Sequence, residues 1–353
     1  MKTCDPYSAS QLFRSPRTVY WEVTRACDMA CQHCRAGAQP DRHERELSQA
    51  QGEMLIDELL SFPRSPLLVL TGGDPMKRDD LPELIGFASR RGMEVALTLA
   101  ATPLVTKRAL IAMQQQGLKR LTIALDGIDA ATHDGMRGEQ GSYARTMENL
   151  RFAKEIGLPM QVSTLISRRN VLQVDGIASL LEPLGVTEWS VHLLVPLGRG
   201  RSEQRIDPFE VEHLFAELFA QSRKRSFRVK TADAPQYRRY LHQNGQVQAN
   251  KVSMNDGKGV MFVSHTGDIY PGALLPVWSG RFPIDSPVTV YQRSPVFTAL
   301  RDPSKLKGKC GVCEFRSVCG GSRARAYAVT RDMLAPEPDC SYQPSSAVKA
   351  LVS

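Results

Sequence analysis

Short apolar segments alternate with longer amphipathic segments over the first two thirds of the chain. The amphipathic segment 48–60 is typical of a helix, because Ser48 can cap its first turn and Leu55, Ile56 and Leu59 share one face. Six apolar segments separated by such patterns predict a row of strand–helix units, and therefore an α/β fold with a parallel sheet. The six predicted strands span residues 20–24, 67–70, 95–99, 121–125, 160–165 and 189–194.

The strand–helix pattern alone fits both a curved barrel and a flat, doubly wound sheet. At 353 residues the chain has room for one barrel-sized unit with an appendage. We therefore expect a partial (β/α)6 barrel of the TIM type with a small C-terminal domain. The active site of such a barrel lies at the C-terminal ends of its strands.

The regions after the sixth predicted strand differ in composition from the barrel. Residues 207–225 predict one more helix, which starts after Asp207-Pro208, and residues 226–258 are polar and irregular. From Gly259 onward, short β segments and turns lead into a cysteine-bearing region. We divide the chain into an N-terminal extension (1–18), a barrel (19–205), a helix and linker (206–258) and a C-terminal domain (259–353).

The composition is that of an ordinary globular protein, with 42% hydrophobic and 23% charged residues. No apolar run approaches the roughly 18 residues that span a bilayer, and the N-terminus lacks the order of a signal peptide, so we expect a cytoplasmic protein without a membrane span. The net charge of +8 is scattered over short basic pairs, which argues against nucleic acid as a partner. Eight cysteines in a reducing compartment indicate metal binding or redox chemistry; seven fall in two groups and Cys4 stands alone.

The first cysteine group, Cys27-x3-Cys31-x2-Cys34, follows directly after the first predicted strand. Its loop is thus expected at the strand end where such folds place their chemistry. A structural zinc site takes four ligands, whereas three thiolates can hold a 4Fe-4S cluster and leave its fourth iron open. The group therefore predicts a reactive cluster.

This spacing, at this place in the chain, resembles the signature of the radical S-adenosylmethionine (SAM) superfamily. The resemblance implies that the open iron binds SAM and that an electron from the cluster cleaves it to a 5′-deoxyadenosyl radical. An external low-potential donor such as flavodoxin or ferredoxin would supply that electron. His33 stands where the family usually has an aromatic residue, so its ring would pack near the adenine; simple closure of the loop is the alternative role.

Three further segments are similar to SAM-binding motifs of that family. Gly72-Gly73-Asp74 after the second strand resembles the Gly-Gly-Glu motif that holds the SAM amino group, with a shorter acid. Asp126 lies in a Leu-Asp-Gly segment whose usual preceding serine is Ala124 here. The resemblance therefore implies that another hydroxyl, such as Thr164 or its neighbour on the fifth strand, contacts the ribose; an ordinary strand role is equally consistent with the sequence.

The second cysteine group is Cys310-x2-Cys313-x5-Cys319-x20-Cys340. Four thiolates fit a zinc tetrahedron or a complete 4Fe-4S cluster, but the second pair is spread too widely for a typical zinc ribbon. The segment resembles the SPASM and twitch domains, which carry auxiliary iron–sulfur clusters. Gly272 occupies the place of a further SPASM cysteine, so the resemblance implies one auxiliary cluster rather than two.

The C-terminal motif most resembles radical SAM enzymes of alternative haem biosynthesis, namely the iron-coproporphyrin decarboxylase and its relatives on the haem d1 route. The resemblance implies a flat, polyanionic tetrapyrrole substrate whose propionates become vinyl groups. Arg199 and Arg201 follow the sixth strand, where they would bind propionates; ion pairs with acidic residues of the linker are the other interpretation.

Two other functions remain open from the sequence. Radical SAM enzymes with SPASM domains also modify ribosomally made peptides, although only 18 residues precede the first strand here, which is too few for a peptide-recognition domain. In a different class, the chain would be a non-catalytic zinc-binding interaction module if the three-cysteine loop were a degenerate site.

Overall fold

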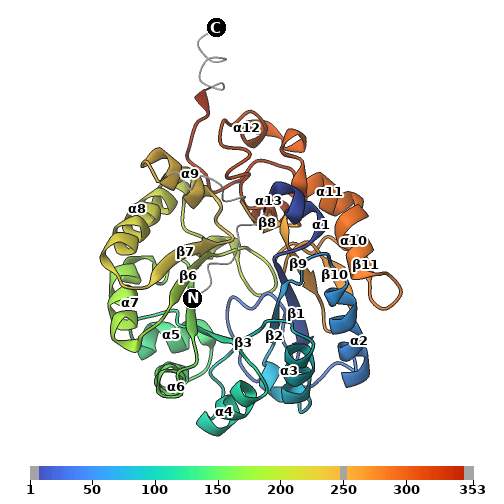
Figure 1. Cartoon of the computed structure of the whole chain (residues 1–353). Helices are drawn as coiled ribbons and strands as arrows, with labels where there is room; N and C mark the ends of the chain where they lie inside the picture. Colours follow the sequence, from blue (N-terminus) through green and yellow to red (C-terminus); the bar gives the residue numbers. More distant parts are fainter. Residues whose placement is uncertain (1–7, 247–252, 346–353) are drawn as a thin grey trace.

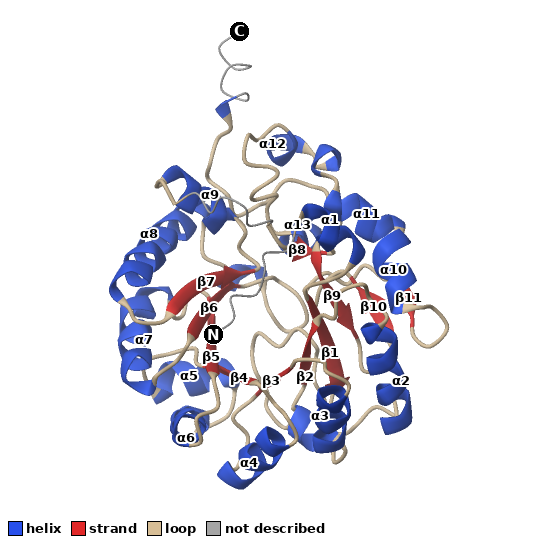
Figure 2. Ribbon diagram, viewed as in Figure 1, coloured by secondary structure: helices blue, strands red, loops and turns tan. Residues whose placement is uncertain are grey.

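The computed structural model describes residues 8–246 and 253–345, in which a curved parallel sheet is enclosed by helices (Figures 1 and 2). The strand order is β11-β10-β9-β1-β2-β3-β4-β5-β6-β7, and β8 pairs with β9. All neighbours from β9 through β1 to β7 are parallel, whereas β10 and β11 are antiparallel. The strands are β1 (Thr18–Thr24), β2 (Leu67–Gly72), β3 (Val95–Leu99), β4 (Arg120–Ala124), β5 (Met160–Ile166), β6 (Glu188–Leu193), β7 (Arg228–Ala232), β8 (Asn255–Asp256), β9 (Gly259–Val263), β10 (Asp268–Tyr270) and β11 (Gly280–Arg281).

The helices cover the outer face of this sheet (Figure 1). In α2 the side chains of Ser48 and Gln51 form a capping box at the start, as the sequence predicts for Ser48. The helices are α1 (Ala9–Arg14), α2 (Gln49–Leu60), α3 (Leu81–Arg90), α4 (Lys107–Gln115), α5 (Ala130–Arg137), α6 (Ser142–Glu155), α7 (Val174–Leu181), α8 (Pro208–Lys224), α9 (Gln236–Gln243), α10 (Pro287–Arg293), α11 (Pro295–Arg301), α12 (Gly308–Gly311) and α13 (Arg323–Thr330).

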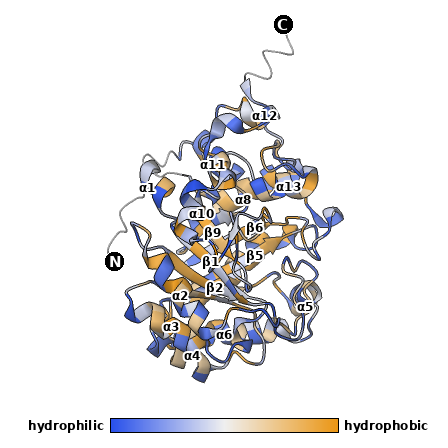
Figure 3. Ribbon diagram, turned by 90° about the vertical axis from the view of Figure 1, so that its right-hand side faces the viewer, coloured by the Kyte–Doolittle hydropathy of each residue, from blue (hydrophilic) through white to orange (hydrophobic). Residues whose placement is uncertain are grey.

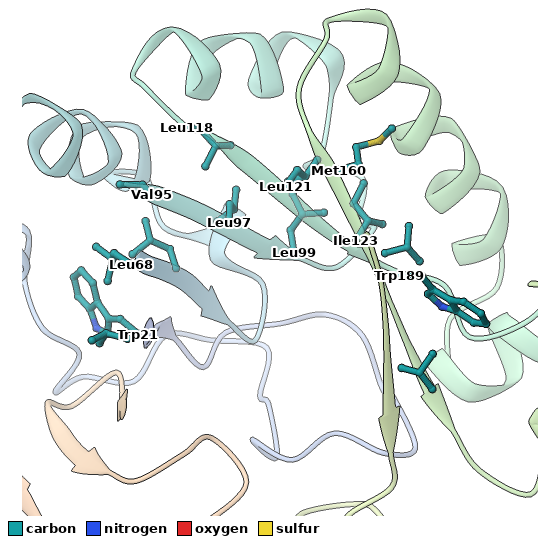
Figure 4. Close-up of a cluster of buried hydrophobic side chains, with 14 of the residues drawn as sticks. Trp21, Leu68, Val95, Leu97, Leu99, Leu118, Leu121, Ile123, Met160 and Trp189 are labelled. Carbon is teal, nitrogen blue, oxygen red and sulfur yellow. The ribbon is translucent and has the colours of Figure 1, made fainter. Parts of the chain in front are cut away.

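The main core lies between the strands and the surrounding helices. Figure 4 shows its side chains, among them Trp21, Leu97 and Trp189, which are fully or almost fully buried. Successive strand residues point to opposite faces, so the alternate positions line the interior of the barrel, which we call the lumen. The strands are accordingly the most hydrophobic segments, while the helices contain both hydrophobic and hydrophilic residues (Figure 3).

The structure confirms the predicted fold class and the six predicted strands, and it adds two parallel strands. The prediction that residues 226–258 are irregular is wrong for β7, which pairs with β6 from Glu188↔Arg228 to His192↔Ala232. Strand β7 contains one buried apolar residue, Val229, because its other positions face the lumen or solvent; a hydrophobic pattern was therefore absent.

The sheet also crosses the predicted domain boundary at Gly259. Strand β9 pairs in parallel with β1, from Thr18↔Val260 to Trp21↔Val263, and leads into β10 and β11. Among the described residues β7 and β9 are not paired, so the barrel is open on that side. The division of the chain into domains remains a prediction.

The C-terminal cysteine segment is anchored to the open side of the barrel. Asn255 Nδ2 donates to the carbonyl of Gly321 at 2.9 Å, and Arg205 in the loop after β6 forms an ion pair with Asp339 at 2.8 Å. The C-terminal strand ends and the second cysteine group are therefore neighbours. None of the helices in the described residues is long and apolar enough to cross a membrane.

Candidate active site

The three-cysteine loop leaves the C-terminal end of β1 and is shaped by its own backbone hydrogen bonds. Cys27 N donates to Gln39 O at 2.7 Å, and Cys34 N donates to Cys31 O at 3.3 Å. Burial, with smaller contributions from Asp74, Cys31 and Cys34, raises the pKa of the Cys27 thiol to about 11. The thiols are thus close enough to affect one another, and cluster binding would have to displace their protons.

The two glycines after β2 permit close packing against the cysteine loop. Gly73 N donates to Thr24 O at 2.9 Å, and Asp74 N donates to Ala26 O at 2.6 Å. A Cβ atom on Gly72 would lie 2.7 Å from Thr24 O, and one on Gly73 would lie 2.5 Å from Ala26 O. The sequence suggested that the glycines admit a ligand; in the structure they admit the neighbouring backbone.

Asp74 lies at the first turn after β2 and is fully buried. Its Oδ2 accepts from Thr102 Oγ1 at 2.6 Å, and its Oδ1 accepts from Met76 N at 3.0 Å. Burial raises the pKa of this carboxyl, against the effect of these hydrogen bonds. Each carboxyl oxygen therefore already has a protein partner, and the predicted contact with the SAM amino group remains a prediction.

Asp126, after β4, lies at the centre of a buried polar cluster. Arg137 Nη2 lies 2.5 Å and His33 Nε2 lies 3.7 Å from its Oδ2, while Leu165 N donates to its Oδ1 at 2.8 Å. Burial opposes ionisation, but Arg137 and its neighbours hold the pKa of Asp126 below its usual range. Burial and then Arg137 lower the pKa of His33 to about 4, so its ring is neutral near pH 7.

Arg137 is the residue of this cluster that the sequence did not single out. It ends α5, contacts both Cys31 and Asp126, and is followed by Gly138 in the left-handed conformation (φ 63°). A Cβ atom on Gly138 would lie 2.6 Å from Ala30 O, so the glycine lets α5 end against the cysteine loop. An arginine before a C-terminal glycine is an ordinary helix ending and therefore gave no functional signal.

Thr164 does not join this cluster. It is fully buried, its hydroxyl donates to Leu125 O at 2.7 Å and it accepts from Trp189 Nε1 at 2.8 Å. The alternation of β5 puts Thr164 on the core face and the half-buried Ser163 on the lumen face. Its predicted contact with the ribose finds no support in this geometry.

The two arginines that the sequence predicts to bind substrate lie in different environments. Arg199 N donates to Cys34 O at 2.9 Å and its guanidinium reaches Met29 O at 3.5 Å, so Arg199 packs on the cysteine loop. Arg201 is exposed. Within residues 8–246 and 253–345 neither forms an ion pair with an acidic side chain.

The four C-terminal cysteines line one hollow at the surface of the C-terminal segment. Glu337 N points at Cys310 Sγ (3.3 Å) and Gly321 N at Cys319 Sγ (3.3 Å), which are donors that favour thiolates. Burial raises the pKa of Cys319 to about 12, so a metal must displace a firmly held proton. In the described part of the chain no three His, Cys, Asp or Glu side chains form a group that could hold a single metal ion, and the auxiliary cluster remains a prediction.

Comparison with known proteins identifies the family. Residues 21–181 match the model of the radical SAM superfamily. The AdoMet-dependent heme synthase of Methanosarcina barkeri is 33% identical over 94% of this chain and 97% of that protein. The chain belongs to the radical SAM superfamily. As a radical SAM enzyme it uses a 4Fe-4S cluster and SAM, and the interpretation as a non-catalytic zinc module is wrong.

Two more similarities bear on this radical SAM enzyme. The mycofactocin maturase MftC of Mycobacterium tuberculosis is 30% identical over 92% of this chain and 83% of that protein. The crystal structure of Streptococcus suis SuiB bound to S-adenosylmethionine superposes with a TM-score of 0.73, covering 93% of this chain and 78% of that one at 13% identity. The second similarity supports the fold alone.

At the N-terminal ends of the strands, away from the cysteine loop, this radical SAM enzyme carries a group of cations that the sequence did not reveal. On β7, Lys230 and Arg228 both contact the buried carboxylate of Glu188 on β6. Burial, and then Arg228, Arg120 and Arg17, lower the pKa of Lys230 to about 8. Positive charge thus exceeds negative charge in this group, which was missed because β7 lies in the segment predicted to be irregular.

Proposed function

We propose that Cys27, Cys31 and Cys34 hold the SAM-binding cluster and that the surrounding polar residues hold SAM. Asp126 is tied to the cysteine loop through His33 of that loop and through Arg137, and Gly72, Gly73 and Asp74 pack against the loop. The cluster and SAM supply the radical when bound. The contribution of this chain is a hydrogen-bonded frame that fixes the loop.

We propose that the substrate is an iron tetrapyrrole and that its propionates are oxidatively decarboxylated to vinyl groups, as in the conversion of iron-coproporphyrin to haem or a related step towards haem d1. The observation that carries this proposal is the position of Arg199, whose backbone and guanidinium both lie on the cysteine loop, where an arginine suits a propionate held close to the radical. The printed name of the Methanosarcina barkeri relative agrees with this substrate class. Arg199 and Arg201 remain proposed propionate contacts at the mouth.

The reaction removes one hydrogen atom, one carbon dioxide and one electron from each propionate that becomes a vinyl group. The radical takes the hydrogen atom, and the electron needs an acceptor within the enzyme. We propose that Cys310, Cys313, Cys319 and Cys340 hold an auxiliary 4Fe-4S cluster for this purpose, since all four line one hollow. An external low-potential protein, such as flavodoxin or ferredoxin, would reduce the SAM-binding cluster.

The test is a single-turnover assay under anaerobic conditions. Enzyme with reconstituted clusters is mixed with SAM, dithionite and iron-coproporphyrin, and the porphyrin is analysed by mass spectrometry. We expect loss of carbon dioxide and hydrogen from propionates, with 5′-deoxyadenosine formed in step. Unchanged porphyrin beside brisk SAM cleavage would reject the substrate, and Cys27→Ala enzyme is the matched inactive control.

Peptide maturation is the second candidate function. It is favoured by the similarity to the mycofactocin maturase MftC, which extends over most of both chains. The same assay with synthetic peptides in place of porphyrin distinguishes the two functions. A peptide that changes mass in proportion to 5′-deoxyadenosine, while iron-coproporphyrin remains intact, would replace our proposal by this one.

A further inference from the structure

The lumen face of β6 carries a histidine, His192, that lies outside the buried cluster around Asp126. Trp189 and Val191 are fully buried in the outer core, so Ser190 and His192 point to the other face. The side chain of His192 is 31% exposed although it lies on an inner strand of the barrel. Its imidazole is therefore open to the lumen.

One ring nitrogen of His192 is fixed by a carboxylate. Its Nδ1 lies 2.9 Å from Asp233 Oδ2. Asp233 follows β7 and holds a left-handed backbone conformation (φ 57°) that is uncommon outside glycine. Its carbonyl accepts from Arg325 Nη2 at 3.1 Å, and Arg325 pairs with Glu337, whose N–H points at Cys310 Sγ. The backbone of Asp233 is thus tied to the second cysteine group, while its carboxylate faces His192.

A histidine held in this way keeps its proton on Nδ1 and presents the lone pair of Nε2. Histidines that ligate metals almost always have such a carboxylate or carbonyl partner, which fixes the tautomer and raises the basicity of the ligating nitrogen. Within the described residues the one polar partner of Nε2 is Ser190 Oγ at 3.4 Å, which is long for a hydrogen bond. Nε2 is therefore available to a ligand.

Within residues 8–246 and 253–345 no other histidine combines an exposed ring nitrogen with a carboxylate on the other nitrogen. His265 also bonds a carboxylate, with Nδ1 2.8 Å from Glu22 Oε1, but it is buried and packs edge-on against His43. His33 and His133 face Asp126 from the buried cluster, while His213 on α8 is exposed.

We propose that His192 Nε2 is an axial ligand to the iron of an iron tetrapyrrole substrate, with Asp233 as the positioning residue that orients the ring. This inference rests on the proposed function and names the group that distinguishes an iron porphyrin from a metal-free one.

The experiment is an anaerobic titration of full-length enzyme, with both clusters reconstituted, using ferric iron-coproporphyrin. Iron ligation is followed by absorption and electron paramagnetic resonance, and affinity by equilibrium binding. Metal-free coproporphyrin serves as the second probe. The variants are His192→Ala, Asp233→Asn and, as the matched control, His213→Ala.

We expect a nitrogen-ligated iron spectrum for the wild type and for His213→Ala, and its loss in His192→Ala, with recovery on addition of imidazole. Asp233→Asn should keep the spectrum but lower the affinity for the iron porphyrin by roughly 10-fold, the usual effect of removing such a partner. Affinity for metal-free coproporphyrin should be the same in all four proteins.

Two outcomes overturn the inference in distinguishable ways. If the wild type decarboxylates iron-coproporphyrin and His192→Ala shows the same iron spectrum and affinity, the ligand assignment is wrong and the proposed function stands. If the wild type binds neither porphyrin, the proposed function fails, and the inference fails with it. Circular dichroism of each variant, with unchanged iron content, separates loss of ligation from loss of folding.

Discussion

Arg137 Nη2 and Asp126 Oδ2 lie 2.5 Å apart in a buried ion pair beside Cys31. The pair joins the end of α5 to the loop after β4, so it couples two elements of the wall to the cysteine loop. Asp126 is fully buried and the Arg137 side chain is only 13% exposed, so the Asp126 carboxylate depends on Arg137 as its counter-charge.

Removal of one member of this pair should be costly. Arg137→Met leaves the Asp126 carboxylate buried without its main counter-charge, and we expect a loss of about 3–5 kcal/mol in the free energy of unfolding. Arg91→Ala removes the exposed pair with Asp57 and should cost about 0–1 kcal/mol. Chemical denaturation of the anaerobically purified proteins checks both values, and equal losses would contradict the importance of the buried pair.

The two cysteine groups should bind iron independently. Cys27→Ala and Cys310→Ala should each lower the iron content from about eight to about four atoms per chain, because each group is proposed to hold one 4Fe-4S cluster. Only Cys27→Ala should abolish reductive SAM cleavage. Iron analysis and 5′-deoxyadenosine assays measure the two effects, and Cys4→Ser, at a position outside the described residues, is the control that should retain all iron.

Gly73→Ala should damage the first cluster alone. The added Cβ would lie 2.5 Å from Ala26 O, so the cysteine loop or the loop after β2 must move. We expect loss of SAM cleavage with the C-terminal iron retained. Gly135→Ala is the matched control, because its Cβ meets nothing closer than Arg169 at 3.7 Å; if both variants kept full activity, the close packing would not matter.

The two mouth arginines should have separable effects. Arg199→Ala removes a contact with Met29 O in the cysteine loop and should slow SAM cleavage as well as weaken porphyrin binding. Arg201→Ala, at an exposed position, should weaken porphyrin binding alone, by a few-fold. Dissociation constants measured beside SAM-cleavage rates decide the point: an unchanged porphyrin affinity in either variant removes that residue from the proposed site.

The barrel was predictable from sequence because its strands bury apolar side chains against the helices. Residues Val95–Leu99 of β3, for instance, were predicted with the bounds that the structure shows. Strand β7 was not predicted from the sequence, because its lumen positions, such as Lys230, are polar. A strand on the inner side of a barrel loses the apolar signal wherever its lumen face binds charge.

The candidate site was predictable only in its local motifs. The cysteine loop and the glycine pair follow strands and were located from spacing. Arg137 was missed and Thr164 was assigned to a role that its contacts do not support, because both depend on which face of an element meets a distant segment. His192 likewise acquires its partner Asp233 only through the pairing of β6 with β7.

The pairing of β9 with β1 has a consequence for synthesis of the protein. β1 is made first, but its second hydrogen-bonding neighbour emerges from the ribosome only after every other parallel strand. Such a long-range contact forms late and slowly. The three thiols that follow β1 therefore spend most of translation beside an unpaired strand edge. Iron and sulfide are best delivered to them after translation of β9 is complete.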